Sequence, residues 1–277
     1  MPLLHAVILG IIQGLTEFLP VSSSAHLLWA HELFHIGELD KAQDLAFDVS
    51  LHGGTLLAIV AYFWRDILNL VGAGVGSILD RSVANDPNRR LAWFIVIATI
   101  PGALFGALLD KFFEETIRAP WIAAIAMICL ALVLLLAENV SRRLKDIRHI
   151  TLGDAIIVGI CQAAALIPGV SRSGVTITAG LFRDMERDTA ARFSFLLSGP
   201  IIAGAVALKT LQMIKAGFPH ELKMPFIVGV VTSAVVGFIA ISILLNYLRT
   251  HSTMVFIVYR ILAGLAVIAY VFFLVRH

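Results

Sequence analysis

The chain has 277 residues, of which 59% are hydrophobic and only 14% charged, and its mean hydropathy is +0.90. Because soluble domains carry about 25% charged residues, this composition excludes a soluble globular protein and indicates a membrane protein with several spans. The formal net charge of +2 gives no electrostatic basis for binding nucleic acid.

Six apolar segments are long enough to approach or complete a membrane crossing, which takes about 20 helical residues. They are 47–64, 91–109, 121–137, 193–208, 226–248 and 254–275. The shorter segments form two pairs, 3–19 with 25–34 and 155–167 with 175–182. Pro20 breaks the first pair and Pro168 the second. A helix, a break and a second short helix predict a re-entrant hairpin, whose irregular backbone must face protein or water.

The two hairpins resemble copies of one element. At one constant offset, Gly10-Ile11 recurs as Gly159-Ile160, Gln13 as Gln162, Val21-Ser22 as Val170-Ser171, and Ser24 as Ser173. Each copy is followed by three spans, and because three is odd the second copy enters the membrane with opposite orientation. The sequence therefore predicts an all-α polytopic membrane protein with one domain, 1–277, and an inverted-topology repeat over about 1–140 and 150–277. Each half is a re-entrant helical hairpin plus three transmembrane helices.

Basic residues concentrate on one predicted side of the membrane, chiefly in 65–90, 142–148 and 183–192. The positive-inside rule makes this side cytoplasmic. Both termini then lie outside, the first hairpin enters from the outside and the second from the cytoplasm. We therefore expect the site to open to the extracytoplasmic side.

Both hairpin breaks carry polar residues that lipid does not solvate. Gln13 and Glu17 are four residues apart and share a helix face. If the outbound helices begin near Ser22 and Ser171, their free N–H groups point at one spot, which suits an anion. Arg172 adds a planar guanidinium group that matches phosphate. The residues therefore predict an anion site where the two breaks meet.

A carboxylate beside an anion site needs a role of its own. Glu17 can hold a divalent cation that bridges to phosphate, handle a proton, or pair with Arg172 as a structural ion pair. His26 can exchange a proton. His52 shows no spacing typical of metal ligands. Arg260 lies inside the last span, where pairing with an acidic residue and snorkelling both remain open.

Two strings carry a family resemblance. The first is Gln13-Gly-Leu-Thr-Glu-Phe-Leu-Pro-Val-Ser-Ser-Ser-Ala-His26, and the second is Pro168-Gly-Val-Ser-Arg-Ser-Gly-Val-Thr176. They closely resemble the Glu/Gln-x-x-x-Glu and PGxSRSxxT elements of the undecaprenyl-diphosphatase (bacitracin-resistance) family, in the same order, and length and hydropathy match over the whole chain. The PGxSRSxxT string is specific, whereas the first string alone is weak.

The resemblance implies an enzyme that removes the terminal phosphate from a C55 polyprenyl diphosphate. The product is the monophosphate lipid carrier of peptidoglycan synthesis, and abundance of the enzyme confers bacitracin resistance. The resemblance further implies a divalent cation, Mg²⁺ or Ca²⁺, as cofactor and a place in the bacterial plasma (inner) membrane. The expected partners are the lipid substrate, the bilayer and, in a homodimer, a second copy of the chain.

The resemblance also implies roles for single residues. The catalytic residues are Glu17, His26, Ser23 and Arg172, and the metal ligands are Glu17 and Gln13. The substrate-binding residues are Ser171, Arg172 and Thr176, to which we add Ser22 and Ser173 from the same two breaks. Other members have Glu at the position of Gln13, so Gln13 would bind a cation through its carbonyl oxygen while Glu17 supplies the charge. The sequence leaves the nucleophile open between Ser23 and an activated water.

Two other functions fit parts of the pattern. A type-2 phosphatidic-acid phosphatase needs a histidine six residues after Arg172, where this chain has Thr178, and a KxxxxxxRP string that this sequence lacks. A polyprenyl-phosphate flippase or transporter fits broken helices in inverted repeats, and the same site would then carry the lipid without hydrolysing it.

Overall fold

The computed structural model describes residues 1–37, 41–83, 86–116, 119–216 and 222–273, and the elements in these ranges are helices. The α-helices are α1 (Leu3–Phe18), α2 (Ser23–Glu32), α3 (Lys41–Tyr62), α4 (Trp64–Leu79), α5 (Pro87–Thr116), α6 (Pro120–Val140), α7 (Leu152–Gln162), α8 (Arg172–Phe182), α9 (Arg187–Ala216), α10 (Lys223–Leu248) and α11 (Met254–Phe273). Two short 3₁₀ helices, η1 (Ile147–His149) and η2 (Ala163–Leu166), flank α7. Helices α3, α5, α6, α9, α10 and α11 are long and apolar enough to cross a membrane, as expected.

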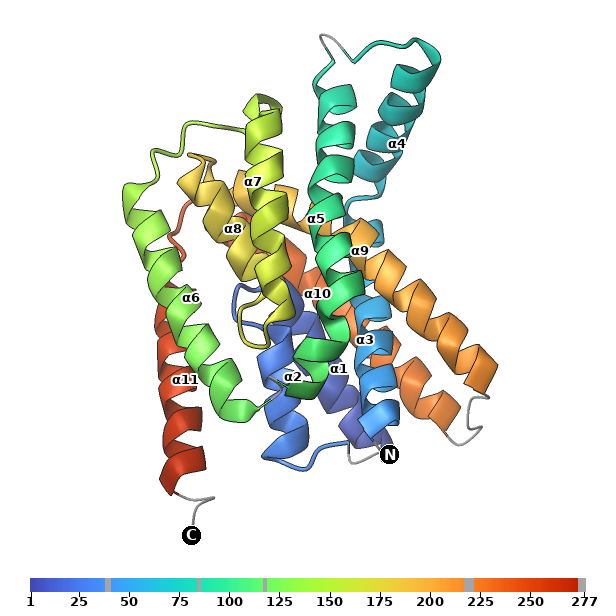
Figure 1. Ribbon diagram of the computed structural model, residues 1–277, viewed down its shortest axis with the longest axis vertical. Coiled ribbons are helices and arrows are strands. Elements are labelled where there is room, and N and C mark those ends of the chain that lie inside the picture. Colours follow the sequence, from blue (N-terminus) through green and yellow to red (C-terminus); the bar gives the residue numbers. More distant parts are fainter. Residues whose placement is uncertain (38–40, 84–85, 117–118, 217–221, 274–277) are drawn as a thin grey trace.

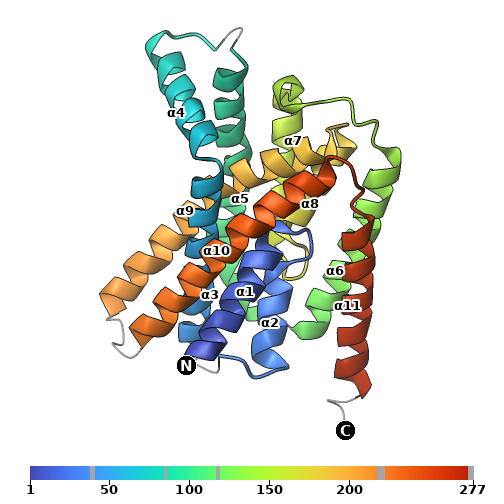
Figure 2. The same cartoon turned by 180° about the vertical axis from the view of Figure 1, so that it is seen from behind.

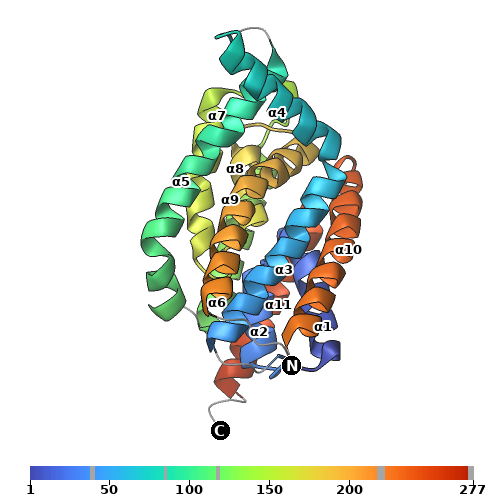
Figure 3. The same cartoon turned by 90° about the vertical axis from the view of Figure 1, so that its right-hand side faces the viewer.

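The long helices surround the short ones. Helices α6 and α11 pair along one side, while α3, α9 and α10 lie on the other, with α1, α2, α7 and α8 between them (Figures 1 and 2). Seen from the side, α3 runs between α9 and α10 (Figure 3). Phe18 of α1 packs edge-on against Phe195 of α9, with ring centroids 5.3 Å apart, in the main apolar core. The beginning of α1 and the end of α11 lie at the same end of the bundle (Figure 1).

The opposite end carries a network of ion pairs at the helix ends. Glu138, near the end of α6, accepts hydrogen bonds from Arg187 at the start of α9 and from the Thr253 hydroxyl, the latter over 2.7 Å. Asp154, near the start of α7, pairs with Lys145 at 2.9 Å. These contacts join the segments in which the sequence collects its basic residues.

Helix α4 lies between the first two predicted spans, in a segment for which the sequence analysis named no element. It contains Gly72, Gly74 and Gly76, each of which disfavours a helix by about 1 kcal/mol relative to alanine. Packing against α5 offsets this cost, and the indole N–H of Trp93 donates to Ser77 Oγ over 2.8 Å. Tertiary contacts therefore decide this helix.

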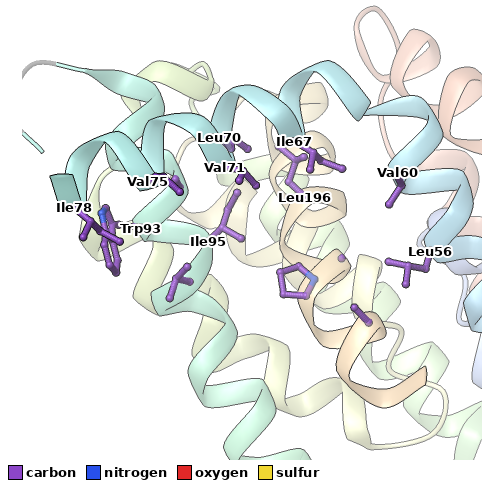
Figure 4. Close-up of a pocket in the computed structure, with 16 residues that line it drawn as sticks. Leu56, Val60, Ile67, Leu70, Val71, Val75, Ile78, Trp93, Ile95 and Leu196 are labelled. Atoms are coloured by element: carbon purple, nitrogen blue, oxygen red, sulfur yellow. The ribbon is translucent and has the colours of Figure 1, made fainter. Parts of the chain in front are cut away.

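A cleft of about 500 Å³ lies between α3, α4, α5 and α9 (Figure 4). Its lining includes Leu56, Val71, Ile95 and Leu196 and carries no charged side chain. An apolar lining of this kind does not suit a charged group, and the polar residues singled out by the sequence lie elsewhere, at the two hairpin turns.

Candidate active site

The two hairpin turns have the same local construction. Helix α1 ends before Pro20 and α2 begins after Ser22; η2 ends before Pro168 and α8 begins after Ser171. Both serines have left-handed backbone conformations, with φ of 77° and 72°. Each serine hydroxyl caps its helix by accepting the N–H three residues on, over 3.4 Å in the first turn and 3.1 Å in the second. A non-glycine residue at such a φ is strained, and strain of this kind gathers at functional sites.

The two turns meet, as the sequence predicts. The Gly169 N–H donates to Ser24 Oγ over 3.4 Å, and Ser173 Oγ donates to the Leu19 carbonyl over 3.2 Å. Gly169 has φ of 95°, and a Cβ at this position would lie 2.1 Å from the Ala123 carbonyl oxygen of α6. Only glycine combines that φ with that approach, so the second turn is seated directly on α6.

Glu17 is the centre of the polar contacts at the turns. Its carboxylate is buried and accepts hydrogen bonds from Ser23 Oγ at 2.7 Å and from Gln13 Nε2 at 3.1 Å. Arg172 Nη2 lies 3.6 Å from the other carboxylate oxygen, so the ion pair, one of the three roles left open for Glu17, forms. Gln13, Glu17, Ser23 and Arg172 are therefore brought together from two turns that are far apart in sequence.

His52 is a member of this cluster that the sequence analysis missed. Its Nε2 lies 3.4 Å from Glu17 Oε2, and its Nδ1 lies 2.8 Å from the Asp48 carbonyl oxygen. Because a carbonyl oxygen only accepts, Nδ1 carries the proton and Nε2 is turned toward the carboxylate. The available signal was a histidine inside an apolar span, since ionisable residues at membrane depth mark functional sites.

His26 makes different contacts from those of Glu17. Its Nδ1 lies 2.7 Å from the Ser22 carbonyl oxygen, and its Nε2 lies 2.6 Å from the Tyr259 hydroxyl of α11. The two rings are stacked, with centroids 5.7 Å apart. Nδ1 is therefore the protonated nitrogen, and Nε2 accepts from Tyr259, a partner that nothing in the local sequence indicated.

Two buried polar atoms at the cluster have no partner among the described residues. They are Nη1 of Arg172, a charged donor, and Oε1 of Gln13, an acceptor. Buried polar groups are nearly always hydrogen-bonded, so an orphaned donor and an orphaned acceptor in one cluster point to a ligand. The donor suits an anion and the acceptor suits a cation or a donor group.

Comparison with known proteins shows the family to which the chain is related. The model of the family "Bacitracin resistance protein BacA" matches residues 6–266. The chain is 49% identical over 276 residues to the undecaprenyl-diphosphatase of Moorella thermoacetica, covering 100% of both chains. It is 48% identical over 264 residues to that of Desulforudis audaxviator, covering 95% of this chain and 96% of the relative. The undecaprenyl-diphosphatase of Thermomicrobium roseum is 44% identical over 276 residues, with 97% of this chain and 98% of the relative covered.

The chain belongs to the BacA family.

Within this BacA-family chain the expected substrate-binding residues divide into two groups. Ser173 and Thr176 are buried inside the protein, where Thr176 Oγ1 donates to the Arg172 carbonyl over 2.7 Å and contacts Ser194 Oγ. Ser22 and Ser171 are buried as helix caps. Arg172 retains partial exposure, with 22% of its side chain accessible. Of these five residues only Arg172 keeps an accessible side chain, while the hydroxyl residues shape the backbone that presents it.

Proposed function

We propose that this chain hydrolyses undecaprenyl diphosphate to undecaprenyl phosphate and inorganic phosphate. The observation that carries the proposal is the meeting of Glu17, Ser23 and Arg172 at the N-termini of two helices, with one guanidinium nitrogen unpartnered. The family and its curated relatives, named undecaprenyl-diphosphatase, support the same activity. The product is the lipid carrier of cell-wall synthesis, and its regeneration confers bacitracin resistance.

Arg172 and the starts of α2 and α8 hold the diphosphate. The guanidinium group offers a planar pair of donors to phosphate oxygens, and the helix N-termini add free N–H groups and a partial positive charge. Phosphoryl transfer depends mainly on positioning and on stabilising the charge of the transferred group. The turn geometry set by Ser22 and Ser171 therefore serves catalysis through the backbone.

Ser23 is the nucleophile in our scheme, and Glu17 is its base. A hydroxyl that donates to a carboxylate over 2.7 Å has the geometry of an activated nucleophile. Ser23 Oγ attacks the terminal phosphorus, its proton passes to Glu17 Oε2, and undecaprenyl phosphate leaves. Water then attacks the phosphoserine, and the proton on Glu17 returns to Ser23 Oγ as that oxygen departs. A water activated by Glu17 is the alternative, and it leaves no phosphorylated enzyme.

His26 and Tyr259 flank the same turn and complete the proton-transfer groups. The Tyr259 hydroxyl donates to His26 Nε2, and the hydrogen bond from Nδ1 to the Ser22 carbonyl fixes the ring. The neutral His26 ring supports the turn beside the cap of α2, and in the reaction its Nε2 takes a proton relayed through Tyr259 and the ring becomes charged.

A divalent cation, Mg²⁺ or Ca²⁺, fits the acceptors on one side of the cluster. Gln13 Oε1 is buried without a partner, and Glu17 supplies a carboxylate next to it. His52 Nε2 lies 3.4 Å from the same carboxylate, and in a neutral ring with its proton on Nδ1 this nitrogen would be the one to bind the ion. Gln13, Glu17 and His52 are the residues that would hold the ion. Because one of them is a glutamine, they do not form a cluster of three His, Cys, Asp or Glu side chains, and the described ranges contain no such cluster. A bound cation would neutralise charge on the diphosphate oxygens.

The hairpins are re-entrant in our proposal, and the halves 1–140 and 150–277 of the single domain form the inverted repeat. Support comes from reciprocal packing, since α1 of the first half lies against α10 of the second, and α7 of the second lies against α5 of the first. A Cβ on Gly10 would approach Gly229 O to 2.7 Å, and one on the equivalent Gly159 would approach Ala98 O to 2.5 Å. Helices α1 and α7 start at opposite ends of the bundle (Figure 1).

The site opens to the extracytoplasmic side of the plasma membrane in this proposal. The loop end with Glu138, Asp154 and their basic partners is cytoplasmic by the positive-inside rule, so the beginning of α1 and the end of α11 lie outside. Helices α1 and α2 enter from the outer end and carry Glu17 and Ser23 inward. A homodimer remains a prediction, and its test is the mass of the purified protein in detergent.

Phosphate release from a C55 polyprenyl diphosphate by purified protein in detergent tests the function. The assay is run with Mg²⁺, with Ca²⁺ and with EDTA, on wild type, Arg172→Ala and the control Ser50→Ala, whose hydroxyl binds the Phe47 carbonyl outside the cluster. We expect release in wild type and the control, and loss in Arg172→Ala and in EDTA. Absence of release by folded wild type that still binds the lipid would favour the flippase. A substrate labelled in its terminal (β) phosphate that transfers label to wild type and not to Ser23→Ala identifies Ser23 as nucleophile.

A further inference from the structure

Arg260 is the largest side chain that the structure buries completely. It lies within α11, and its exposed fraction is 0%. No carboxylate oxygen of the described residues lies within ion-pairing distance, so the acidic partner that the sequence left open is absent from that part of the chain. Its complete burial also excludes snorkelling. A buried cation without a counter-ion is costly and needs compensation from other groups.

The compensation comes from four main-chain carbonyl groups. Arg260 Nη1 donates to Pro20 O over 2.9 Å, and Nη2 donates to Gly169 O over 3.0 Å and Val170 O over 3.2 Å. Nε donates to Met127 O of α6 over 3.0 Å. One guanidinium group thus binds the first turn, the second turn and α6 at the same time.

Three of these carbonyls, those of Pro20, Gly169 and Val170, belong to the irregular backbone between the paired short helices. Within the protein they have no helical partner, and a buried carbonyl without a donor is destabilising. Among the described residues, the other hydrogen bonds between the turns are those of Ser24, over 3.4 Å, and Ser173, over 3.2 Å. The fixed fork of an arginine is the one side chain that donates to several carbonyls in a set geometry.

We propose that Arg260 is a positioning residue for the phosphatase reaction: it holds the two turns at a fixed separation through their carbonyl groups. This separation fixes the distance between the starts of α2 and α8, and therefore the positions of Glu17 on one side and Arg172 on the other side of the bound diphosphate. Its charge has no carboxylate to cancel it, so it also adds to the attraction for the anionic substrate. This inference rests on the proposed site at the two turns.

The test compares Arg260→Lys, Arg260→Met and Arg260→Ala with wild type and the control Arg192→Met, which removes an arginine paired with Asp66 outside the site. Phosphate release gives kcat and KM, and thermal unfolding in detergent gives the folded fraction at the assay temperature. We expect Arg260→Met to lose about 100-fold in kcat while folded, because a displacement of about 1 Å costs about that much. Lysine keeps the charge but not the fork, so Arg260→Lys should recover only part of the loss.

Chemical rescue separates positioning from general stability. Millimolar methylguanidinium should raise kcat of Arg260→Ala about 10-fold or more, because this variant has a buried cavity with the shape of a guanidinium group. It should leave kcat of wild type and of Arg192→Met unchanged. Wild-type kcat and KM in folded Arg260→Met overturn the proposal. So does activity that follows the folded fraction in every variant without rescue.

Two further comparisons separate a failure to fold, and a failure of the proposed site, from a failure of the role of Arg260. If Arg260→Met and Arg260→Ala do not fold, folded Arg260→Lys decides, and wild-type kcat in that variant overturns the proposal. Arg172→Ala is assayed beside them. Full activity in Arg172→Ala refutes the proposed site itself, whereas its loss together with wild-type kinetics in the Arg260 variants refutes only the role of Arg260.

Discussion

Gly169→Ala is expected to loosen the second turn and to reduce both stability and activity. The new Cβ would lie 2.1 Å from the Ala123 carbonyl oxygen and 2.7 Å from the carbonyl carbon of the same residue. An ordinary contact is about 3.5 Å, so the turn must move by more than about 1 Å. Ala123 is buried, and the atoms in the clash are main-chain atoms of α6, so no side-chain rotation can relieve it.

The magnitude follows from two costs. A non-glycine residue at φ of 95° costs about 1–2 kcal/mol, and overpacking against a helix backbone costs about 1–3 kcal/mol. The sum predicts a loss of about 2–5 kcal/mol in the free energy of unfolding. Gly169 also accepts a hydrogen bond from Arg260 and donates one to Ser24, so the shift changes the site. We expect kcat to fall about 100-fold.

Thermal unfolding in detergent and phosphate release measure the two effects on the same preparation. Gly72→Ala is the matched control, because its helical backbone has nothing within 4 Å of the new Cβ. That variant should gain up to about 1 kcal/mol from helix propensity and keep its activity. Wild-type melting temperature and kcat in Gly169→Ala would refute the reasoning that the turn is seated on α6.

Three further substitutions probe the cluster. Glu17→Gln keeps the shape of the side chain and removes the base, so kcat should fall by a factor of about 10²–10⁴. The charge control Asp66→Asn should keep its activity. A fall in kcat of less than about threefold in Glu17→Gln contradicts the role of Glu17. Tyr259→Phe removes one hydrogen bond to His26, so we expect kcat to fall about 3–10-fold with little change in KM. An unchanged kcat would show that Tyr259 takes no part in proton transfer. His52→Ala should weaken the binding of Mn²⁺ about 10–100-fold, as measured by electron paramagnetic resonance of the free ion. The control Ser50→Ala should bind Mn²⁺ as wild type does. Equal affinity in His52→Ala and wild type excludes His52 as a ligand.

The sequence indicated the helical spans and the two breaks because these depend on local properties. An apolar run of about 20 residues is a span whatever surrounds it, and a proline followed by serine ends one helix and caps the next. Gln13 and Glu17 were expected on one helix face, and the 3.1 Å hydrogen bond between them shows it. Helix α4 was missed because its glycines argue against a helix and only its packing on α5 supports one.

The sequence by itself determined which residues stand at the two breaks, the count of spans and the family. Only the tertiary structure decided which distant side chains join them: His52 from α3, and Tyr259 and Arg260 from α11. Helical periodicity says which residues share a face, but it is silent on which helix that face meets. That choice follows from how the helices pack around the two turns, where buried carbonyls and a buried carboxylate must each find a partner.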